Sequence, residues 1–454
     1  MIHAYKNNGY NIVLDENSGS VHVVDEMVYD IMHAIEEKPG ISNDEIAGSL
    51  KDKYPQEELE EAFSEIAELK EQGLLFSEDP YEKIIDAFTS KRTTVVKALC
   101  LHVAHACNLS CRYCFAGEGE YHGERGLMSY ETGKQALDFL IANSGSRVNL
   151  EVDFFGGEPL LNWKTVKDLV AYGRSQEEAH NKKFRFTLTT NGVLIDDDVI
   201  EFCNKEMSNV VLSLDGRKEV HDLMRPFRGG GGSYDTVMPK FKKFAESRNQ
   251  TNYYVRGTFT HFNTDFAEDV LKVADEGFKQ ISVEPVVAPE SEEYAIRKED
   301  LPEILEQYDY LAAEMLKREK QGKGFNFFHF MIDLSGGPCV YKRLSGCGSG
   351  GEYLAVTPTG ELYPCHQFVG NEKFIVGNVW DGVTEHEICE TFAKCNVYSK
   401  KECRSCFARF YCSGGCAANA YNFTGSIDGT YEIGCIMQRK RVECALMIKA
   451  ALDE

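Results

Sequence analysis

The chain has 454 residues, of which 43% are hydrophobic and 27% are charged, so it is long enough for two or three domains with sizeable cores. Its formal net charge is −23, which opposes binding to a phosphate backbone and argues against nucleic acid as a partner. No run of 18 apolar residues and no signal-peptide pattern at Met1–Lys6 is found, so we expect a cytoplasmic protein that does not span a membrane.

Residues 1–85 are predicted to form a small α+β domain. Ser42–Glu45 is a capping box that opens a helix, and Gly73 ends the last helical pattern. The expected strands are Asn11–Leu14, Ser20–Val24 and Leu74–Phe76, and the expected helices carry Met27–Ile35, Ile46–Leu50 and Leu59–Leu69. Strands, three helices and a closing strand are typical of a winged helix-turn-helix.

A winged helix-turn-helix usually indicates DNA binding, but the charge of this segment argues against that function. Residues 1–80 contain five Lys and no Arg, against nineteen Asp and Glu. Such a surface repels phosphate. A winged domain without a basic surface is better suited to binding a peptide, for instance as an added strand at its sheet edge.

Residues 92–325 are predicted to form a second domain in which strands and helices alternate. The six expected strands are Ala98–Val103, Asn149–Phe155, Arg185–Thr190, Val210–Leu214, Tyr253–Thr260 and Gln280–Val286. Helical patterns fill the gaps, among them Ser129–Ala142, Trp163–Ala179 and Tyr234–Ala245. Six βα units predict an α/β fold with a parallel sheet or a partial (β/α)6 barrel, which carries its chemistry at the C-terminal ends of the strands.

The sixteen cysteines are distributed unevenly along the chain. Residues 1–99 hold none, and eleven lie between Cys339 and Cys444. In a reducing compartment, cysteines are metal ligands or catalytic thiols more often than disulfides. From about residue 336 the chain is rich in Gly, Cys and polar turns, so we expect residues 336–454 to form a third domain stabilised by metal.

Cys107, Cys111 and Cys114 form a C-x3-C-x2-C motif directly after the first expected barrel strand. Three thiolates can hold three irons of a [4Fe–4S] cluster and leave the fourth iron open to a small molecule. A zinc site would need a fourth ligand, which His102 or His105 could supply, and it is the alternative at this position.

This motif, with Tyr113 before its third cysteine, resembles that of the radical S-adenosylmethionine (SAM) superfamily. Gly156–Pro159, Thr189–Gly192 and Ser213–Gly216 end strands two, three and four and resemble further family elements. The resemblance implies SAM contacts by Tyr113, Gly156, Gly157, Glu158, Pro159, Thr190, Asn191, Ser213, Asp215, Val283 and Glu284, and by Arg225 and Arg256 as partners of the SAM carboxylate. For each arginine, a surface ion pair is the alternative.

The resemblance also implies a mechanism. SAM binds the open iron, the reduced cluster donates an electron, and a 5′-deoxyadenosyl radical abstracts hydrogen from an unactivated C–H bond. Cys107, Cys111 and Cys114 would be catalytic in this sense. A reductant such as flavodoxin or ferredoxin would supply the electron.

The C-terminal cysteines resemble the seven-cysteine SPASM extension of radical SAM peptide-modifying enzymes. The resemblance implies two auxiliary [4Fe–4S] clusters, one on Cys403, Cys406, Cys412 and Cys435 and one on Cys347, Cys365 and Cys416. A zinc ribbon on Cys403, Cys406, Cys412 and Cys416 is the alternative. Five cysteines are expected to be ordinary thiols: Cys100, Cys203, Cys389, Cys395 and Cys444.

Two further residues bear on the chemistry of the second auxiliary site. Cys339 is the nearest spare thiol; if it stays free, an open iron could bind a substrate cysteine, and sulfur beside a carbon radical is what thioether formation needs. Sulfatase-maturating relatives have an acidic residue after the cysteine that matches Cys365, proposed as a base. His366 stands there and can accept a proton, but formylglycine formation becomes the less favoured interpretation.

The order of the three segments resembles enzymes that act on ribosomally synthesised peptides, most closely the maturases of SCIFF peptides. That resemblance implies that residues 1–85 grip the leader of a small Cys-rich precursor. The barrel would then install a thioether (sactipeptide-type) crosslink from a Cys thiol to a carbon of another residue. The alternatives are another radical SAM–SPASM modification, such as a C–C crosslink or residue oxidation, and a non-catalytic iron–sulfur electron-transfer or peptide-binding protein.

Overall fold

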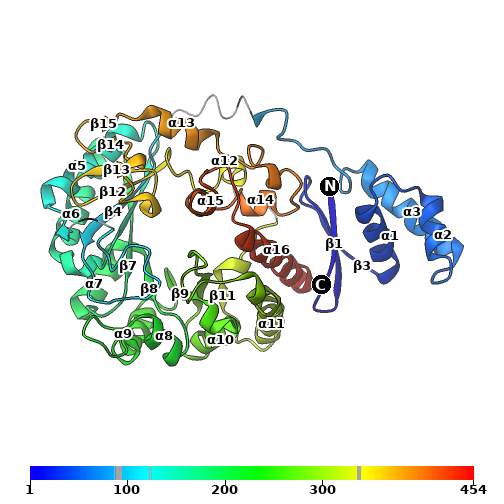
Figure 1. The fold of residues 1–454 in the computed structure, drawn as a ribbon, viewed down its shortest axis with the longest axis horizontal. Helices are drawn as coiled ribbons and strands as arrows, with labels where there is room; N and C mark the ends of the chain where they lie inside the picture. The colour runs from blue at the N-terminus through cyan, green and yellow to red at the C-terminus, as the bar shows by residue number, and fades with distance from the viewer. Residues whose placement is uncertain (86, 88–94, 122, 124, 335–338, 454) are drawn as a thin grey trace.

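The computed structural model describes residues 1–85, 87, 95–121, 123, 125–334 and 339–453. Figure 1 shows the N-terminal domain at one end of the molecule, a curved sheet with outer helices at the other end, and C-terminal elements between them. The predicted domain boundaries at residues 92 and 336 lie outside the described residues. Among the helices that are described, none combines the length and apolar character needed to cross a bilayer.

The N-terminal domain consists of an antiparallel sheet and three helices. The sheet has the order β1 (Ile2–Asn7), β2 (Tyr10–Asp15) and β3 (Val21–Val24), followed by α1 (Glu26–Glu37), α2 (Asn43–Leu50) and α3 (Gln56–Glu71). The capping box between Ser42 and Glu45 is confirmed. Strand β1 was not predicted, and it contributes one edge of the sheet.

The predicted closing strand Leu74–Phe76 is wrong. The segment forms a bend, and Phe76 has a positive φ of 54°, which is incompatible with an extended strand. The segment contacts β3 through a side chain: Nε2 of His22 lies 3.2 Å from the carbonyl oxygen of Leu74. The described strands include no backbone pairing between this segment and β3. The strand that would form the wing of the predicted winged helix is therefore not among the described strands.

The two faces of the N-terminal sheet pack against different parts of the molecule. Side chains from one face, Ile2, Ala4 and Val13, share a core with α1, α2 and α3. Side chains from the other face, Tyr5, Ile12 and Leu14, join the main core, and α16 (Glu432–Asp453) contacts all three strands. The alternation of apolar residues along β1 and β2 thus serves two interfaces.

Six parallel strands of the second sheet confirm the predicted barrel units. They are β4 (Ala98–His105), β6 (Asn149–Gly156), β7 (Lys183–Thr190), β8 (Met207–Ser213), β9 (Tyr253–Phe259) and β10 (Gln280–Pro285). They lie side by side in chain order, with β11 (Asn326–Phe327) beyond β10 and the short β5 (Gly126–Leu127) paired to β4. The fold is a partial α/β barrel.

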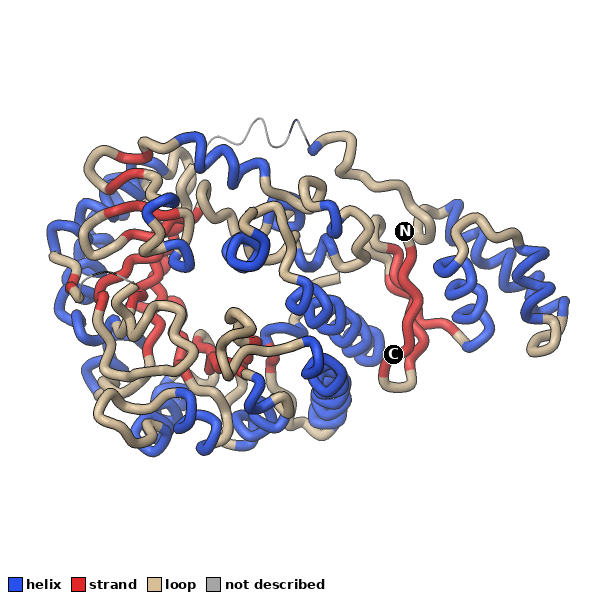
Figure 2. The backbone as a smooth tube through the Cα atoms, in the orientation of Figure 1, coloured by secondary structure: helices blue, strands red, loops and turns tan. Residues whose placement is uncertain are grey.

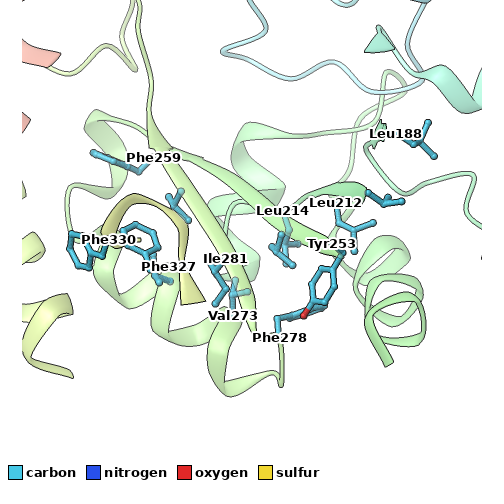
Figure 3. Close-up of a cluster of buried hydrophobic side chains, with 14 of the residues drawn as sticks. Leu188, Leu212, Leu214, Tyr253, Phe259, Val273, Phe278, Ile281, Phe327 and Phe330 are labelled. Atoms are coloured by element: carbon cyan, nitrogen blue, oxygen red, sulfur yellow. The ribbon is translucent and has the colours of Figure 1, made fainter. Parts of the chain in front are cut away.

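Helices connect these strands and lie outside the curved sheet, as Figure 2 shows. They are α5 (Tyr130–Asn143), α6 (Trp163–His180), α7 (Asp197–Glu206), α8 (Lys218–Met224), α9 (Tyr234–Ser247), α10 (Phe266–Asp275) and α11 (Leu301–Lys320). Figure 3 shows buried side chains such as Leu212, Tyr253 and Ile281 packed with Val273 of α10. Alternate strand residues, such as Thr187, stay half-buried and leave the concave face polar.

The C-terminal region continues the barrel sheet instead of forming a separate layer. Strand β12 (Tyr353–Val356) pairs parallel with β4, and β13 (Glu361–Tyr363), β14 (Gly377–Asn378) and β15 (Gly382–Val383) follow antiparallel. Short helices separate the cysteine turns: α12 (Val340–Ser345), α13 (His386–Lys394), α14 (Arg409–Cys412) and α15 (Ala417–Thr424). The long α16, which was not predicted, packs against α11.

Candidate functional site

The C-x3-C-x2-C motif lies in the loop that leaves the C-terminal end of β4. The backbone amide of Ser110 donates to the carbonyl of Pro226 at 2.9 Å, and that of Arg112 donates to the carbonyl of Met224 at 2.9 Å. The last residue of α8 and the segment that follows it therefore hold the loop at two points. These two contacts present the three cysteines at the carboxyl ends of the strands, where the chemistry of such folds takes place.

The thiols of Cys107, Cys111 and Cys114 lie close enough to interact electrostatically with one another. Burial raises the pKa of Cys107 to about 11 and that of Cys111 to about 12. Both thiols are therefore protonated near neutral pH unless a bound cation replaces the proton. Three soft sulfur ligands gathered in one buried loop suit an iron–sulfur cluster.

The two histidines that could have completed a zinc site, His102 and His105, lie in β4, the strand that precedes this loop. His102 is fully buried, and its Nδ1 is 3.1 Å from Nε2 of His105. Burial lowers the pKa of His105 to about 4, so its ring is neutral. In the part of the chain that the structure describes, no three His, Cys, Asp or Glu side chains converge on one metal ion. Thiols that each bind a different iron of a cluster need no such convergence.

Gly156 and Gly157 bring the end of β6 closer to the cysteine loop than any side chain would allow. Gly156 has a φ of 128°, and a Cβ there would lie 2.3 Å from the carbonyl oxygen of Ala104. A Cβ on Gly157 would lie 2.1 Å from the carbonyl oxygen of Ala106. The amides of Gly157 and Glu158 donate to these two carbonyls at 2.7 and 2.8 Å. The glycine pair thus fastens β6 to the residue before Cys107.

Glu158 ties the end of β6 to the end of β7. Its buried carboxylate accepts hydrogen bonds from Thr190 Oγ1 and the Asn191 amide, both at 2.8 Å, and from the Leu160 amide at 2.9 Å. Burial raises the pKa of Glu158 to about 7, against the opposing effect of these three donors. Pro159 is also buried and begins a single 3-10 turn. The predicted Glu158 and Thr190 therefore contact each other within the site.

Asp215, just after β8, makes hydrogen bonds with four other residues. Tyr113 donates its hydroxyl to Asp215 Oδ2 at 2.6 Å, and Arg225 donates from Nε to Oδ1 at 3.0 Å. The Thr258 amide donates to Oδ1 at 3.0 Å, while the Asp215 amide donates to Nδ1 of His221 at 3.3 Å. Arg225 is therefore in a buried ion pair, and the predicted alternative of a surface ion pair does not describe it.

The remaining predicted SAM contacts lie on β8, β9 and β10. Ser213 and Arg256 are register partners on neighbouring strands. Arg256 is half-exposed, with its Nη2 4.0 Å from Oε1 of Glu284. Val283 packs its side chain in the hydrophobic core, so it can offer the site its backbone alone.

The predicted auxiliary cysteines gather in two groups. The thiols of Cys403, Cys406, Cys412 and Cys435 all interact electrostatically with one another, and so do those of Cys347, Cys365 and Cys416. Burial raises the pKa of Cys412 to about 11 and that of Cys403 to about 12. The zinc-ribbon alternative would need Cys416 in the first group, but Cys416 lies with the second. That either group binds a cluster stays a prediction.

His366 faces the barrel from the turn after β13. Its ring centroid is 5.2 Å from that of Phe155 at the end of β6 and 5.7 Å from that of Phe115, which follows Cys114. Burial lowers the pKa of His366 to about 4, so the ring is neutral at pH 7. The second cysteine group and the first cysteine loop therefore meet at this histidine.

The other cysteines divide as follows. Cys339 is exposed and occupies the N-cap position of α12, where its side chain makes no capping hydrogen bond. The five cysteines expected to be ordinary thiols are all buried: Cys100, Cys203, Cys389, Cys395 and Cys444. Burial in apolar surroundings is what an inert structural thiol requires.

Two residues at the first site had not been predicted. Asn108 accepts a hydrogen bond from Nδ2 of Asn191 at 2.7 Å, and Arg228 donates from Nε to the Cys107 carbonyl at 2.8 Å. Asn108 lies inside the cysteine motif, so its position was the available signal. Arg228 follows Arg225 by three residues and precedes the glycine loop 229–232, but nothing local to the sequence indicated its partner.

Residues 101–286 match the family model of the radical SAM superfamily. This range runs from β4 to the residue after β10, so it contains the six parallel strands and the strand-end loops described above. It forms a radical SAM domain, the class of domain that binds SAM and a [4Fe–4S] cluster.

Relatives extend the likeness beyond this domain. A cysteine-type anaerobic sulfatase-maturating enzyme from Clostridium perfringens is 27% identical over 334 residues, which cover 68% of this chain and 85% of that protein. The solved structure of native anSMEcpe with bound AdoMet has a TM-score of 0.64 at 22% identity and covers 79% of this chain and 100% of that one. Streptococcus suis SuiB bound to the precursor peptide SuiA has a TM-score of 0.54 at 18% identity, with coverage of 94% and 98%. The chain is thus related to the sulfatase-maturating enzymes and shares the fold of SuiB.

Proposed function

We propose that this protein is a radical SAM maturase that joins a cysteine thiol to a carbon of another residue in a ribosomally synthesised precursor peptide. The observation that carries the proposal is the meeting of the first cysteine loop with the group of Cys347, Cys365 and Cys416, where His366, the neighbour of Cys365, lies beside Phe115 and Phe155. This arrangement would hold substrate sulfur next to the carbon that loses hydrogen.

The first site would bind the cluster and SAM with the residues that its geometry gathers. Cys107, Cys111 and Cys114 would ligate a [4Fe–4S] cluster, which with SAM supplies a 5′-deoxyadenosyl radical. The Gly156–Gly157 backbone lies against the loop and could receive the SAM amino group. Arg225, held by Asp215, would place one positive charge beside Cys111, whose pKa it lowers against the larger effect of burial.

The C-terminal groups would hold two auxiliary clusters. The group of Cys347, Cys365 and Cys416 has three thiols, so the fourth iron would bind Cys339 or would stay open to a cysteine of the peptide. A substrate cysteine in that position would give up its thiol proton on binding iron, and His366 would accept it. The lowered pKa of about 4 makes this ring a weak base, so the transfer also requires that iron lower the pKa of the thiol. Each crosslink removes two hydrogens from the peptide and consumes one thiol: the 5′-deoxyadenosyl radical would take one hydrogen atom from carbon, the thiol would lose its proton to a base, and the remaining electron would pass to an auxiliary cluster when the C–S bond forms.

The N-terminal domain would bind the leader of the precursor. A cavity of about 310 Å³ lies between β3, α1 and α3, and β3 is an edge strand. Its lining is largely apolar and includes Val23, which is 43% exposed. An extended peptide could add to the β3 edge and insert alternate side chains into this cavity. A flavodoxin or ferredoxin would serve as the reductant.

The test is anaerobic co-expression with a small Cys-rich precursor, followed by tandem mass spectrometry. A thioether is expected to lower the peptide mass by two hydrogens per link and to remove one alkylatable thiol per link. A loss of two hydrogens with every thiol still alkylatable would replace the proposal with a C–C crosslink or an oxidation.

The control for catalysis is 5′-deoxyadenosine, measured after reduction in the presence of SAM. Its absence from fully reconstituted protein would indicate a non-catalytic electron-transfer or peptide-binding protein. The C107A variant should form none, and C203A, which removes a buried thiol elsewhere, should match the wild type.

A further inference from the structure

Lys400 is a buried lysine with no carboxylate partner among the described residues. It is 2% exposed, and its Nζ donates to the carbonyls of Ile427 and Gly429 at 2.8 and 2.9 Å. No ion pair joins it to any acidic side chain that the structure describes. A buried charge is costly unless it is compensated, and two carbonyl dipoles compensate an ammonium incompletely.

The side chain lies between the two C-terminal cysteine groups. A Cβ added to Gly414 would lie 3.6 Å from both Cδ and Cε of Lys400, so the lysine stem packs on this glycine. Gly414 belongs to the turn from Cys412 of the first group to Cys416 of the second. Lys400 also lines a small cavity together with Cys347 of the second group.

The charge of Lys400 acts on both groups. Its ammonium is close enough to Cys403, Cys416 and Cys435 to interact electrostatically with each of these three sulfur atoms. Cys403 and Cys435 belong to the first group and Cys416 to the second. The amide of Cys403 also donates to the Lys400 carbonyl at 3.2 Å, which fixes the lysine to the first cysteine of its own loop.

We propose that the Lys400 ammonium is the shared counter-charge of the two auxiliary sites and holds both auxiliary clusters at a more positive reduction potential than their thiolates alone would give. The inference rests on the proposed function, because it requires that both groups bind clusters. Thiolate-ligated clusters carry net negative charge, which is the compensation that the buried ammonium lacks. Lys400 is thus a positioning residue that acts through the cluster ligands.

The test is redox titration of the full chain, with its clusters reconstituted anaerobically and followed by electron paramagnetic resonance. K400M removes the charge and both hydrogen bonds, K400Q removes the charge but can still donate, and K400R keeps the charge. K401M, at the exposed neighbouring residue, is the matched control. K400M and K400Q are expected to lower the ratio of reduced to oxidised form of both auxiliary clusters about tenfold at a fixed potential, which is about 59 mV for one electron. K400R and K401M should stay near the wild type.

The outcomes separate this inference from the proposed function. Wild-type protein that binds about four irons instead of about twelve would overturn the auxiliary clusters and the inference together. About twelve irons, with unchanged potentials in K400Q, would overturn the inference alone. A shift in the reduction potential of only one auxiliary cluster would show that Lys400 is not a counter-charge shared by both. If K400M does not fold, the comparison of K400Q with K400R still tests the role of the charge. An equal shift of the reduction potentials in both variants would mean that the shape of the side chain matters and its charge does not.

Discussion

His221 illustrates how burial of one side chain sets its protonation. Its Nδ1 accepts from the Asp215 amide at 3.3 Å, and its Nε2 lies 2.9 Å from Ser233 Oγ, so the neutral ring with hydrogen on Nε2 satisfies both contacts. Burial lowers the pKa of His221 to about 4. Protonation would cost the ring its bond to Asp215, the residue that anchors Tyr113 and Arg225.

We predict that His221 makes the protein less stable as the pH falls. Because the folded pKa lies below the unfolded value of about 6.5, the unfolded chain binds the proton first, so this contribution is complete above pH 6.5 and is lost on acidification. Between pH 7.5 and 5.5 the loss should be about 1.4 kcal/mol. Urea unfolding of wild type and H221Q at both pH values measures it. An equal pH dependence in the two proteins would contradict the prediction.

The spacing of the cysteines predicted which thiols lie together in the first site. The sequence did not predict which acidic residue each arginine would contact. The three cysteines of the first loop are neighbours along the chain, so their convergence needs no long-range contact. Arg225 and Arg256 were predicted to have equal roles, yet Arg225 is buried against Asp215 while Arg256 is half-exposed near Glu284. Which carboxylate faces which arginine depends on how β8, β9 and β10 align.

At the scale of elements, the junction of β6 with the cysteine loop depends on Gly157. We predict that G157A forces the Ala106 carbonyl away, because the added Cβ would lie 2.1 Å from its oxygen. Overpacking of this kind costs about 1–3 kcal/mol. Iron content should fall by up to about four per chain, and SAM cleavage should fall at least tenfold. G126A, whose Cβ would meet nothing within 4 Å, should match the wild type; normal iron binding in G157A would refute the prediction.

The cavity between β3, α1 and α3 leads to a second prediction about an element of the fold. V23K places a charge in the apolar lining of the 310 Å³ cavity, so precursor affinity should fall at least tenfold, or about 1.4 kcal/mol. Fluorescence anisotropy with a labelled precursor measures the Kd. V148K, on an exposed valine of the barrel, is the matched control. An unchanged Kd in V23K would place the leader elsewhere, while 5′-deoxyadenosine formation without peptide should be normal in both variants.

Over the whole molecule, Arg409 connects the N-terminal domain to the auxiliary cysteine loop. It is 6% exposed and lies between Cys406 and Cys412. Its Nη2 is 2.9 Å from Asp79 Oδ2 and 3.1 Å from Glu16 Oε1. A buried arginine with two acidic partners from another domain makes their relative placement specific.

We predict that R409M destabilises the protein by about 3–5 kcal/mol, because Asp79 would remain buried without a cation and Glu16 would keep only the N-terminal ammonium, 3.8 Å away. E16Q should recover part of that loss in the double variant. R185M, which breaks an exposed ion pair with Glu151, should cost at most about 1 kcal/mol. Thermal unfolding monitored by circular dichroism measures all four proteins. A Tm of R409M equal to that of R185M would contradict the role of Arg409.

The sequence by itself determined the six parallel strands, the cysteine loop after the first of them, and the glycines and polar residues at the following strand ends. These features are encoded locally, by alternation along a strand and by spacing within a few residues. Tertiary structure alone decided that β12 extends the barrel sheet, that β1 completes the N-terminal sheet, and that the Leu74–Phe76 strand does not form. It also decided that α16 packs on the N-terminal sheet and that Lys400 lies between the two auxiliary cysteine groups. These outcomes depend on contacts between residues far apart in the chain, and no local pattern encodes which distant surface will bury a given strand, helix or charge.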